Sequence, residues 1–279
     1  MVAEPTLMQQ TTFWALAIWL VGALSGSPAL ATRCEDPRGF QAWLESFKQE
    51  AMAQGISQGA IDSALRGIDY DPNIISRDHR QGVFQQSFEQ FASRMVSTHR
   101  LKKGADMLKR YGSILDRIEQ QFGVPPSVIV AIWGFETDFG TNLGKFPTFR
   151  SLASLAYDCR RSALFQAELL DALRIVERGD MSPGEMRGAW AGEIGQTQFM
   201  PSSYFKYAID FDSNGRRDLI RSVPDALAST ANYLKSHDWR RGEPWAHGSP
   251  NFEVLLRWNE SQVYSRTLAY FAEKLDGEP

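Results

Sequence analysis

Glu136 is the residue of this chain whose position most strongly suggests catalysis. It lies in the stretch IWGFETDFG, where its neighbours are mostly apolar and an ionised side chain is costly. On a helix spanning residues 126–139, Glu136 shares one face with Ile129 and Trp133, because these positions follow helical spacing. It also falls in the last turn, close to the negative end of the helix dipole.

Both features raise the pKa of the Glu136 carboxyl, since each disfavours the ionised form. A protonated carboxyl in an apolar pocket is the general acid that glycoside cleavage needs. The usual hydrolytic scheme needs a second carboxylate. Asp138 points to another side of the helix, and Glu193 serves only if the fold brings it close. Helix geometry by itself favours an alternative, in which Glu136 is an edge residue whose charge reaches solvent.

A second candidate site is the stretch DFDSNGRRD, which resembles a calcium-binding loop. The residues at its ligand positions are Asp210, Asp212, Asn214, Arg216 and Asp218. Arg216 would contribute its backbone carbonyl. Position 12 is Arg221, where such a loop needs a bidentate glutamate, so binding should be weak. The sequence leaves two hypotheses open: a structural Ca²⁺, or a turn held by side-chain-to-backbone hydrogen bonds. The chemistry assigned to Glu136 requires no cofactor.

The composition is that of a folded globular protein. The chain has 279 residues, of which 43% are hydrophobic and 23% charged, and its formal net charge is −3. No basic tract stands out, which argues against a nucleic-acid partner.

The N-terminus predicts export. The apolar run at residues 11–24 is short for a bilayer span and is followed by SGSPALA, which ends in the small-x-small triplet Ala29-Leu30-Ala31. We therefore predict that residues 1–31 are a signal peptide cleaved after Ala31, leaving no stable membrane span. An uncleaved anchor is the alternative, because no Lys or Arg precedes the apolar run.

Two cysteines, Cys34 and Cys159, are present in the chain. An even number of cysteines in an exported protein suggests a disulfide, here one that ties the mature N-terminus to the middle of the chain. The alternative is two free buried thiols.

Most of the mature chain is predicted to be helical, because apolar residues recur at helical spacing or because residues typical of helix ends bound the segments. The predicted helices span residues 40–55, 56–68, 126–139, 164–178, 224–236 and 261–275, and residues 82–123 predict two more that separate near Gly104. The best strand candidate is Asn251–Trp258, where Phe252 and Val254 alternate with other residues. The fold class is mainly α with a small sheet.

Three long segments, in this order, resemble the lytic murein transglycosylases of the B type: GVPPSVIVAIWGFETDFG, GEIGQTQFMPSSYFKYAIDFDSNGRRDL and DALASTANYLKSHDW. The resemblance covers nearly all of the mature chain. It implies a lysozyme-like α+β fold with helical lobes and a reduced small β element. It also implies one catalytic domain at residues 32–279, with a lysozyme-like core from about residue 115 and a helical N-terminal lobe.

The resemblance implies a periplasmic enzyme that cleaves the β-1,4 bond between N-acetylmuramic acid and N-acetylglucosamine in peptidoglycan glycan strands. Glu136 would protonate the glycosidic oxygen and then take a proton from the C6 hydroxyl of the sugar. That hydroxyl attacks C1 and forms a 1,6-anhydro product, so no second carboxylate is needed. A hydrolytic muramidase of the same fold and a non-catalytic peptidoglycan-binding protein remain as alternatives.

The resemblance also implies a set of substrate-binding residues: Gln198, Asn259, Arg160, Arg161, Tyr264 and Trp258. Structural roles are the alternative for Gln198, the arginines and Tyr264. The sequence departs from the family at Ala189, where a serine is common, so one polar contact to Glu136 or the sugar should be missing. The segment 240–250 is shorter than in many members, so the small β-rich part of the cleft, on which distal sugar subsites depend, should be reduced.

Overall fold

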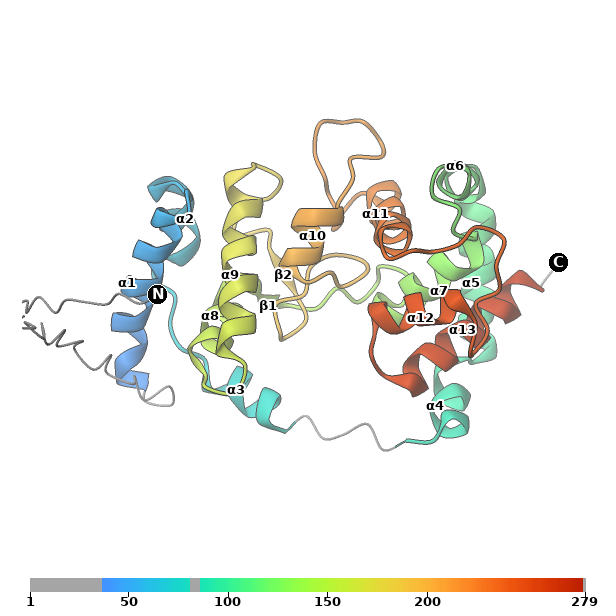
Figure 1. The fold of residues 1–279 in the computed structure, drawn as a ribbon, viewed down its shortest axis with the longest axis horizontal. Coiled ribbons are helices and arrows are strands. Elements are labelled where there is room, and N and C mark those ends of the chain that lie inside the picture. The colour runs from blue at the N-terminus through green and yellow to red at the C-terminus, as the bar shows by residue number, and fades with distance from the viewer. Residues whose placement is uncertain (1–36, 81–85, 278–279) are drawn as a thin grey trace, which may run out of the picture. The chain divides into compact units, whose positions relative to one another are not determined.

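The computed structural model describes residues 37–80 and 86–277 (Figure 1). The first helices are α1 (Phe40–Ala53), α2 (Gln58–Leu65), α3 (Pro72–His79), α4 (Phe88–Met95), α5 (Thr98–Arg110), α6 (Gly112–Phe122) and α7 (Pro126–Thr137), after a short 3-10 turn at Pro37–Gly39. The later helices are α8 (Thr148–Tyr157), α9 (Ser162–Glu177), α10 (Pro201–Tyr207), α11 (Val223–Ser236), α12 (Pro250–Trp258) and α13 (Gln262–Asp276). The predicted signal peptide and Cys34 lie outside these residues, so the cleavage site and the disulfide to Cys159 stay predictions.

Two hydrophobic clusters hold the helices together. One is built mainly from α1, α2, α3, α8, α9 and α10, and the other mainly from α6, α7, α11, α12 and α13. Figure 1 shows the helices of the first cluster on the left and those of the second on the right. Each cluster combines segments that are far apart in the sequence. The division into a helical N-terminal lobe and a core from about residue 115 stays a prediction.

A two-stranded antiparallel sheet is the β structure of the described residues. Its strands are β1 (Phe146–Pro147) and β2 (Arg187–Gly188), and Phe146 pairs with Gly188. The mainly helical fold with a small β element is therefore confirmed. The strand predicted at Asn251–Trp258 is wrong, because these residues form α12. Its buried residues Phe252 and Leu255 are three positions apart, and Ser249 caps its N-terminus.

The predicted break at Gly104 is also wrong. Gly104 lies inside α5, and the breaks fall instead at Ser97 and Tyr111. A Cβ at Gly104 would lie 2.8 Å from a methyl group of Leu275, so the glycine allows α5 and α13 to pack closely. In the part of the chain that the structure describes, none of the helices has the length and apolar character needed to cross a membrane.

Candidate active site

Helix α7 carries Glu136, and contacts with neighbouring helices fix the position of α7. The helix is buried along most of its length and packs against α5, α6, α11 and α13. At its end, Asp138 and Phe139 adopt left-handed backbone conformations, with φ of 51° and 60°. Lys103 donates to the Asp138 backbone oxygen at 3.0 Å and to its carboxylate at 2.9 Å. The last turn of α7, with Glu136 in it, is therefore anchored to α5.

Glu136 Oε1 accepts two hydrogen bonds from side chains of the C-terminal helices. The Tyr264 hydroxyl donates at 2.5 Å and the Trp258 indole Nε1–H at 3.0 Å. Burial raises the pKa of Glu136, while these two donors act in the opposite direction, and the charge of Glu193 adds to the increase. The carboxyl is thus positioned by neutral donors and held toward its protonated form.

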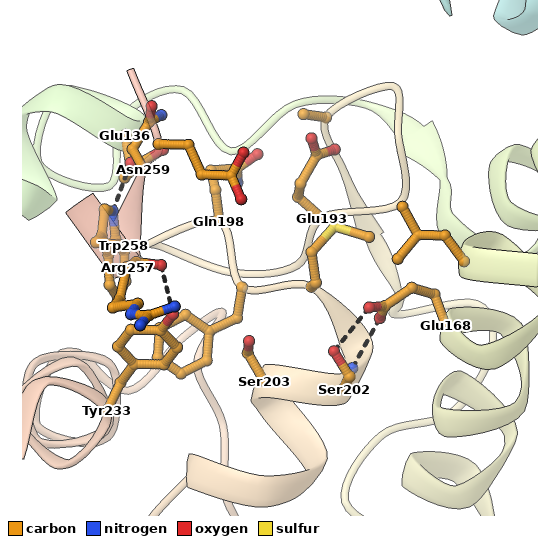
Figure 2. A pocket seen from close by; sticks show the side chains of 15 residues that line it. Glu136, Glu168, Glu193, Gln198, Ser202, Ser203, Tyr233, Arg257, Trp258 and Asn259 are labelled. Carbon is orange, nitrogen blue, oxygen red and sulfur yellow. Dashed lines mark hydrogen bonds between the residues drawn. The ribbon is translucent and has the colours of Figure 1, made fainter. Parts of the chain in front are cut away.

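A cleft runs past Glu136 on both sides. One side is a cavity of about 750 Å³ and the other one of about 630 Å³, and both are lined by Glu136, Ala189 and Gln198. Figure 2 shows the larger cavity with Glu136, Gln198 and Asn259 at one end and Glu168 at the other. Because the two cavities share these lining residues, the cleft suits a chain-like ligand that extends past the acid.

The loop after β2 brings Glu193 into the same cavity as Glu136 (Figure 2). The backbone of this loop is tightly packed, since a Cβ at Gly188 would lie 1.7 Å from the Glu193 carbonyl oxygen. Ile194 and Phe199 then exchange backbone hydrogen bonds at 2.8 and 3.0 Å. The sequence suggested Glu193 only on condition that the fold brought it near, and the fold does so.

A third carboxyl, Glu168 of α9, also lines this cavity, and sequence reasoning missed it. It accepts hydrogen bonds from Ser202 N at 2.9 Å and Ser202 Oγ at 2.7 Å, which holds the first turn of α10. Burial raises its pKa, and the Ser202 donors act against this. The signal was present, because Glu168 shares a helix face with Phe165 and Leu169, both buried.

Several predicted substrate residues do line the cleft. Gln198, Trp258 and Asn259 line the cavity beside Glu136, and Tyr264 contacts Glu136 directly. The Gln198 side-chain nitrogen donates to the backbone oxygens of Leu143 and Gly195 at 3.2 and 2.7 Å. It is therefore held in place by the loops on either side.

Asn259 joins α12 to α13. Its side-chain oxygen accepts from Ser261 N at 3.0 Å, and Ser261 in turn caps α13. This turn places Trp258 and Tyr264 on the same side of Glu136, although they come from different helices.

The arginine pair lies outside the lining of these two cavities. Arg160 and Arg161 both form ion pairs with the buried carboxylate of Asp78, Arg160 through a hydrogen bond from Nε at 2.7 Å. Burial raises the pKa of Asp78, but the two guanidinium groups outweigh this and hold it below its usual range. Arg161 nevertheless acts on Glu193 through its charge.

The predicted calcium loop brings together a different set of carboxylates from the one expected. One oxygen each from Asp210, Asp212 and Asp225 lies within 4.8 Å of the others. Asp218 instead accepts hydrogen bonds from the backbone N–H groups of Ile220 and Arg221, at 3.1 and 2.9 Å.

The side chain of Arg221, which stands at position 12 of the calcium-loop pattern, forms an ion pair with Glu185. Burial raises the pKa of Asp225, and the charge of Asp212 adds to the increase. Carboxylate oxygens are ligands that calcium prefers, and those of Asp210 and Asp212 also accept hydrogen bonds from Asn214 N at 3.0 and 3.2 Å, as the alternative of a self-bonded turn predicts.

Comparisons with known proteins agree with this geometry. The family described as the transglycosylase SLT domain matches residues 39–249. The membrane-bound lytic murein transglycosylase B of Escherichia coli (strain K12) is 33% identical over 199 residues, which cover 71% of this chain and 55% of that protein. The chain thus spans about half the length of this curated relative.

Solved structures give the same result. SltB3 from Pseudomonas aeruginosa, crystallised with NAG-anhNAM-pentapeptide, matches with a TM-score of 0.81 and 30% identity, over 85% of this chain and 80% of that one. SltB1 from the same organism matches with a TM-score of 0.79 and 25% identity, over 84% of this chain and 98% of that one. From the length of the family match and the identity to its relatives, this chain belongs to the transglycosylase SLT domain family.

Proposed function

We propose that this protein is a lytic transglycosylase that cleaves the β-1,4 bond between N-acetylmuramic acid and N-acetylglucosamine in peptidoglycan. The observation that carries the proposal is Glu136, a half-buried carboxyl between two cavities, whose Oε1 accepts from Tyr264 and Trp258. The family relationship supports the same substrate, since SltB3 was crystallised with peptidoglycan fragments.

In the first step Glu136 gives its proton to the glycosidic oxygen while the bond from that oxygen to C1 breaks. Burial raises the pKa of Glu136, so the acid form persists to higher pH than in an exposed glutamate. The 2-acetamido group of the substrate stabilises the sugar cation. The Tyr264 and Trp258 donors then stabilise the carboxylate that is left behind, because both already point at Oε1.

In the second step the ionised Glu136 takes the proton of the C6 hydroxyl, and the C6 oxygen attacks C1. The product carries a 1,6-anhydro ring, and Glu136 is protonated again. The nucleophile belongs to the same sugar, so the reaction gains from proximity and needs no bound water. Gln198 and Asn259 are the polar side chains of the cavity wall that would fix the sugar beside Glu136.

A hydrolytic muramidase is the second candidate, because Glu193 supplies a second carboxyl to the cavity that contains Glu136. In that reaction water replaces the C6 hydroxyl as nucleophile and the product has a reducing end.

The proposed calcium site is formed by Asp210 and Asp212 of the loop together with Asp225 of α11. When bound there, the ion would supply charge neutralisation between these carboxylates. The proposed location of the enzyme is the periplasm, which rests on the predicted signal peptide and on the nature of the substrate.

Mass spectrometry of the soluble products from purified sacculi tests the proposal, with Glu136→Gln assayed beside the unsubstituted protein. Products lighter by one water than hydrolytic muropeptides, absent with the variant, are the expected result. Reducing-end products would establish the muramidase instead. Release of anhydro products by a correctly folded Glu136→Gln variant would contradict the role of Glu136.

A further inference from the structure

Glu193 is a cleft carboxyl that the mechanism above does not use. Its Oε2 accepts a hydrogen bond from Ala191 N at 3.0 Å, and its own backbone N–H also contributes. Among the described residues it forms no ion pair, although Arg161 attracts it through space. A carboxyl that is positioned by backbone donors and faces a ligand cavity without a cationic partner can interact with a positive charge on the ligand.

The position of Glu193 is rigid. Gly188 packs so closely against the Glu193 carbonyl that no side chain fits there, and Gly192, just before Glu193, has a φ of 98°. The residue after Glu193, Ile194, is paired with Phe199 in both directions. Electrostatic stabilisation of a transition state depends on such preorganisation, because no reorientation is then needed during the reaction.

The surroundings of the two carboxyls decide which one keeps a proton. Glu136 has two neutral donors and a neighbouring carboxylate, whereas Glu193 has two backbone N–H donors and the attraction of Arg161. Burial raises the pKa of both carboxyls; the charge of Glu193 adds to the increase at Glu136, whereas the charge of Arg161 acts against the increase at Glu193. These surroundings favour the ionised form at Glu193 and the protonated form at Glu136.

The other charged side chains around the cleft are those of Lys145, Glu168, Arg257 and Glu260, each of which lines one of the two cavities. Tyr264 contacts Glu136 from α13. Of the carboxylates in this set and Glu193, only Glu193 contributes to the raised pKa of Glu136.

We propose that Glu193 is the second functional carboxylate of this active site, which stabilises the positive charge that develops on the sugar when Glu136 protonates the glycosidic oxygen. This inference rests on the proposed function. Glu193 stays ionised throughout and transfers no proton. The proton of Glu136 goes to the leaving oxygen, which departs as a neutral hydroxyl group, and the cationic sugar then faces the carboxylates of both Glu136 and Glu193. The charge is lost when the C6 oxygen bonds to C1 and its proton returns to Glu136.

The test is the pH dependence of kcat/KM on soluble glycan strands for Glu193→Gln. Glu193→Ala is the second variant, because alanine has no polar side-chain group that would be left without a hydrogen-bond partner. The neutral variants should lower kcat about 10- to 100-fold with little change in KM, as expected for a contact made mainly in the transition state. The basic limb should move to lower pH, because the pKa of Glu136 falls once its charged neighbour is removed. The acidic limb, which reports protonation of Glu193, should disappear.

Glu168→Gln is the matched control, since it neutralises another carboxyl of the same cavity that does not act on the pKa of Glu136. Its basic limb should stay at the pH of the unsubstituted protein. Both Glu193 variants showing unchanged kcat and an unchanged pH profile would overturn the inference. Reducing-end products from the unsubstituted protein, or activity in Glu136→Gln, would contradict the proposed function instead.

Discussion

The Tyr264 hydroxyl lies 2.5 Å from Glu136 Oε1, which joins the C-terminal helix α13 to the end of the buried helix α7. The two residues are 128 positions apart in the sequence. Burial and the neighbouring carboxyl also raise the pKa of Tyr264 well above its usual value, so the phenol remains a donor. Glu136, the proposed acid, is therefore held by a neutral partner that does not compete for its proton.

Replacing Tyr264 with phenylalanine should change the pH profile of the enzyme in a defined direction. The Tyr264 hydrogen bond lowers the pKa of Glu136, so its loss should raise that pKa further and move the basic limb of kcat/KM to higher pH. We expect kcat to fall about 10-fold, because the carboxylate formed in the first step loses a donor. A basic limb that moves to lower pH would contradict this role for Tyr264.

Replacing Glu136 with glutamine should make the protein more stable than the unsubstituted protein, by a difference that grows as the pH rises above 4.5. The folded protein holds the Glu136 proton more tightly than the unfolded chain, whose carboxyl titrates near 4.5. Between the unfolded and folded pKa values the native state binds more protons, so Glu136 makes the free energy of unfolding decrease with increasing pH. Below pH 4.5 this effect is absent. Urea unfolding of the variant and of the unsubstituted protein at pH 4 and at pH 8 measures this effect. The two proteins differing by the same free energy of unfolding at both pH values would contradict the prediction.

Replacing Gly188 with alanine should disrupt the site through the backbone. The added Cβ would lie 1.7 Å from the Glu193 carbonyl oxygen, so the loop that carries Glu193 must move. We expect a loss of about 2–4 kcal/mol in the free energy of unfolding and a large loss of activity. Gly184→Ala is the control, because nothing lies within 4 Å of its added Cβ. Thermal unfolding that shows similar effects for both substitutions would contradict the argument.

Calcium should stabilise the protein through the loop at Asp210 and Asp212. An ion that binds only the folded state raises Tm, and the stabilisation grows with the logarithm of its concentration once that exceeds Kd. We expect an increase with millimolar calcium after chelation and none in Asp210→Ala. Magnesium at the same concentration is the control, since it binds such loops more weakly. A Tm that does not respond to calcium would leave the loop as a turn held by its own hydrogen bonds.

Local patterns in the sequence were sufficient to predict many of the helices and to single out Glu136 as the proposed acid. Helical spacing and end signals identified α7, α9, α11 and α13, because the amphipathic face of a helix and its caps are encoded within a few residues. The same spacing placed Glu136 on an apolar face. Where two local signals competed, the prediction was wrong: Asn251–Trp258 alternates like a strand, yet Phe252 and Leu255 are buried on one side of a helix.

Tertiary structure alone decided how the site is completed. Trp258 and Tyr264 reach Glu136 from helices more than a hundred positions later in the chain, and no local pattern reports which atoms meet across such a distance. Gly104 looked like a helix break, but its role is the close contact with Leu275. Glu193 became part of the cleft because β2 pairs with β1 and fixes the loop that follows. The residue types came from the sequence, whereas their distances and burial, which set the pKa values, depend on long-range packing.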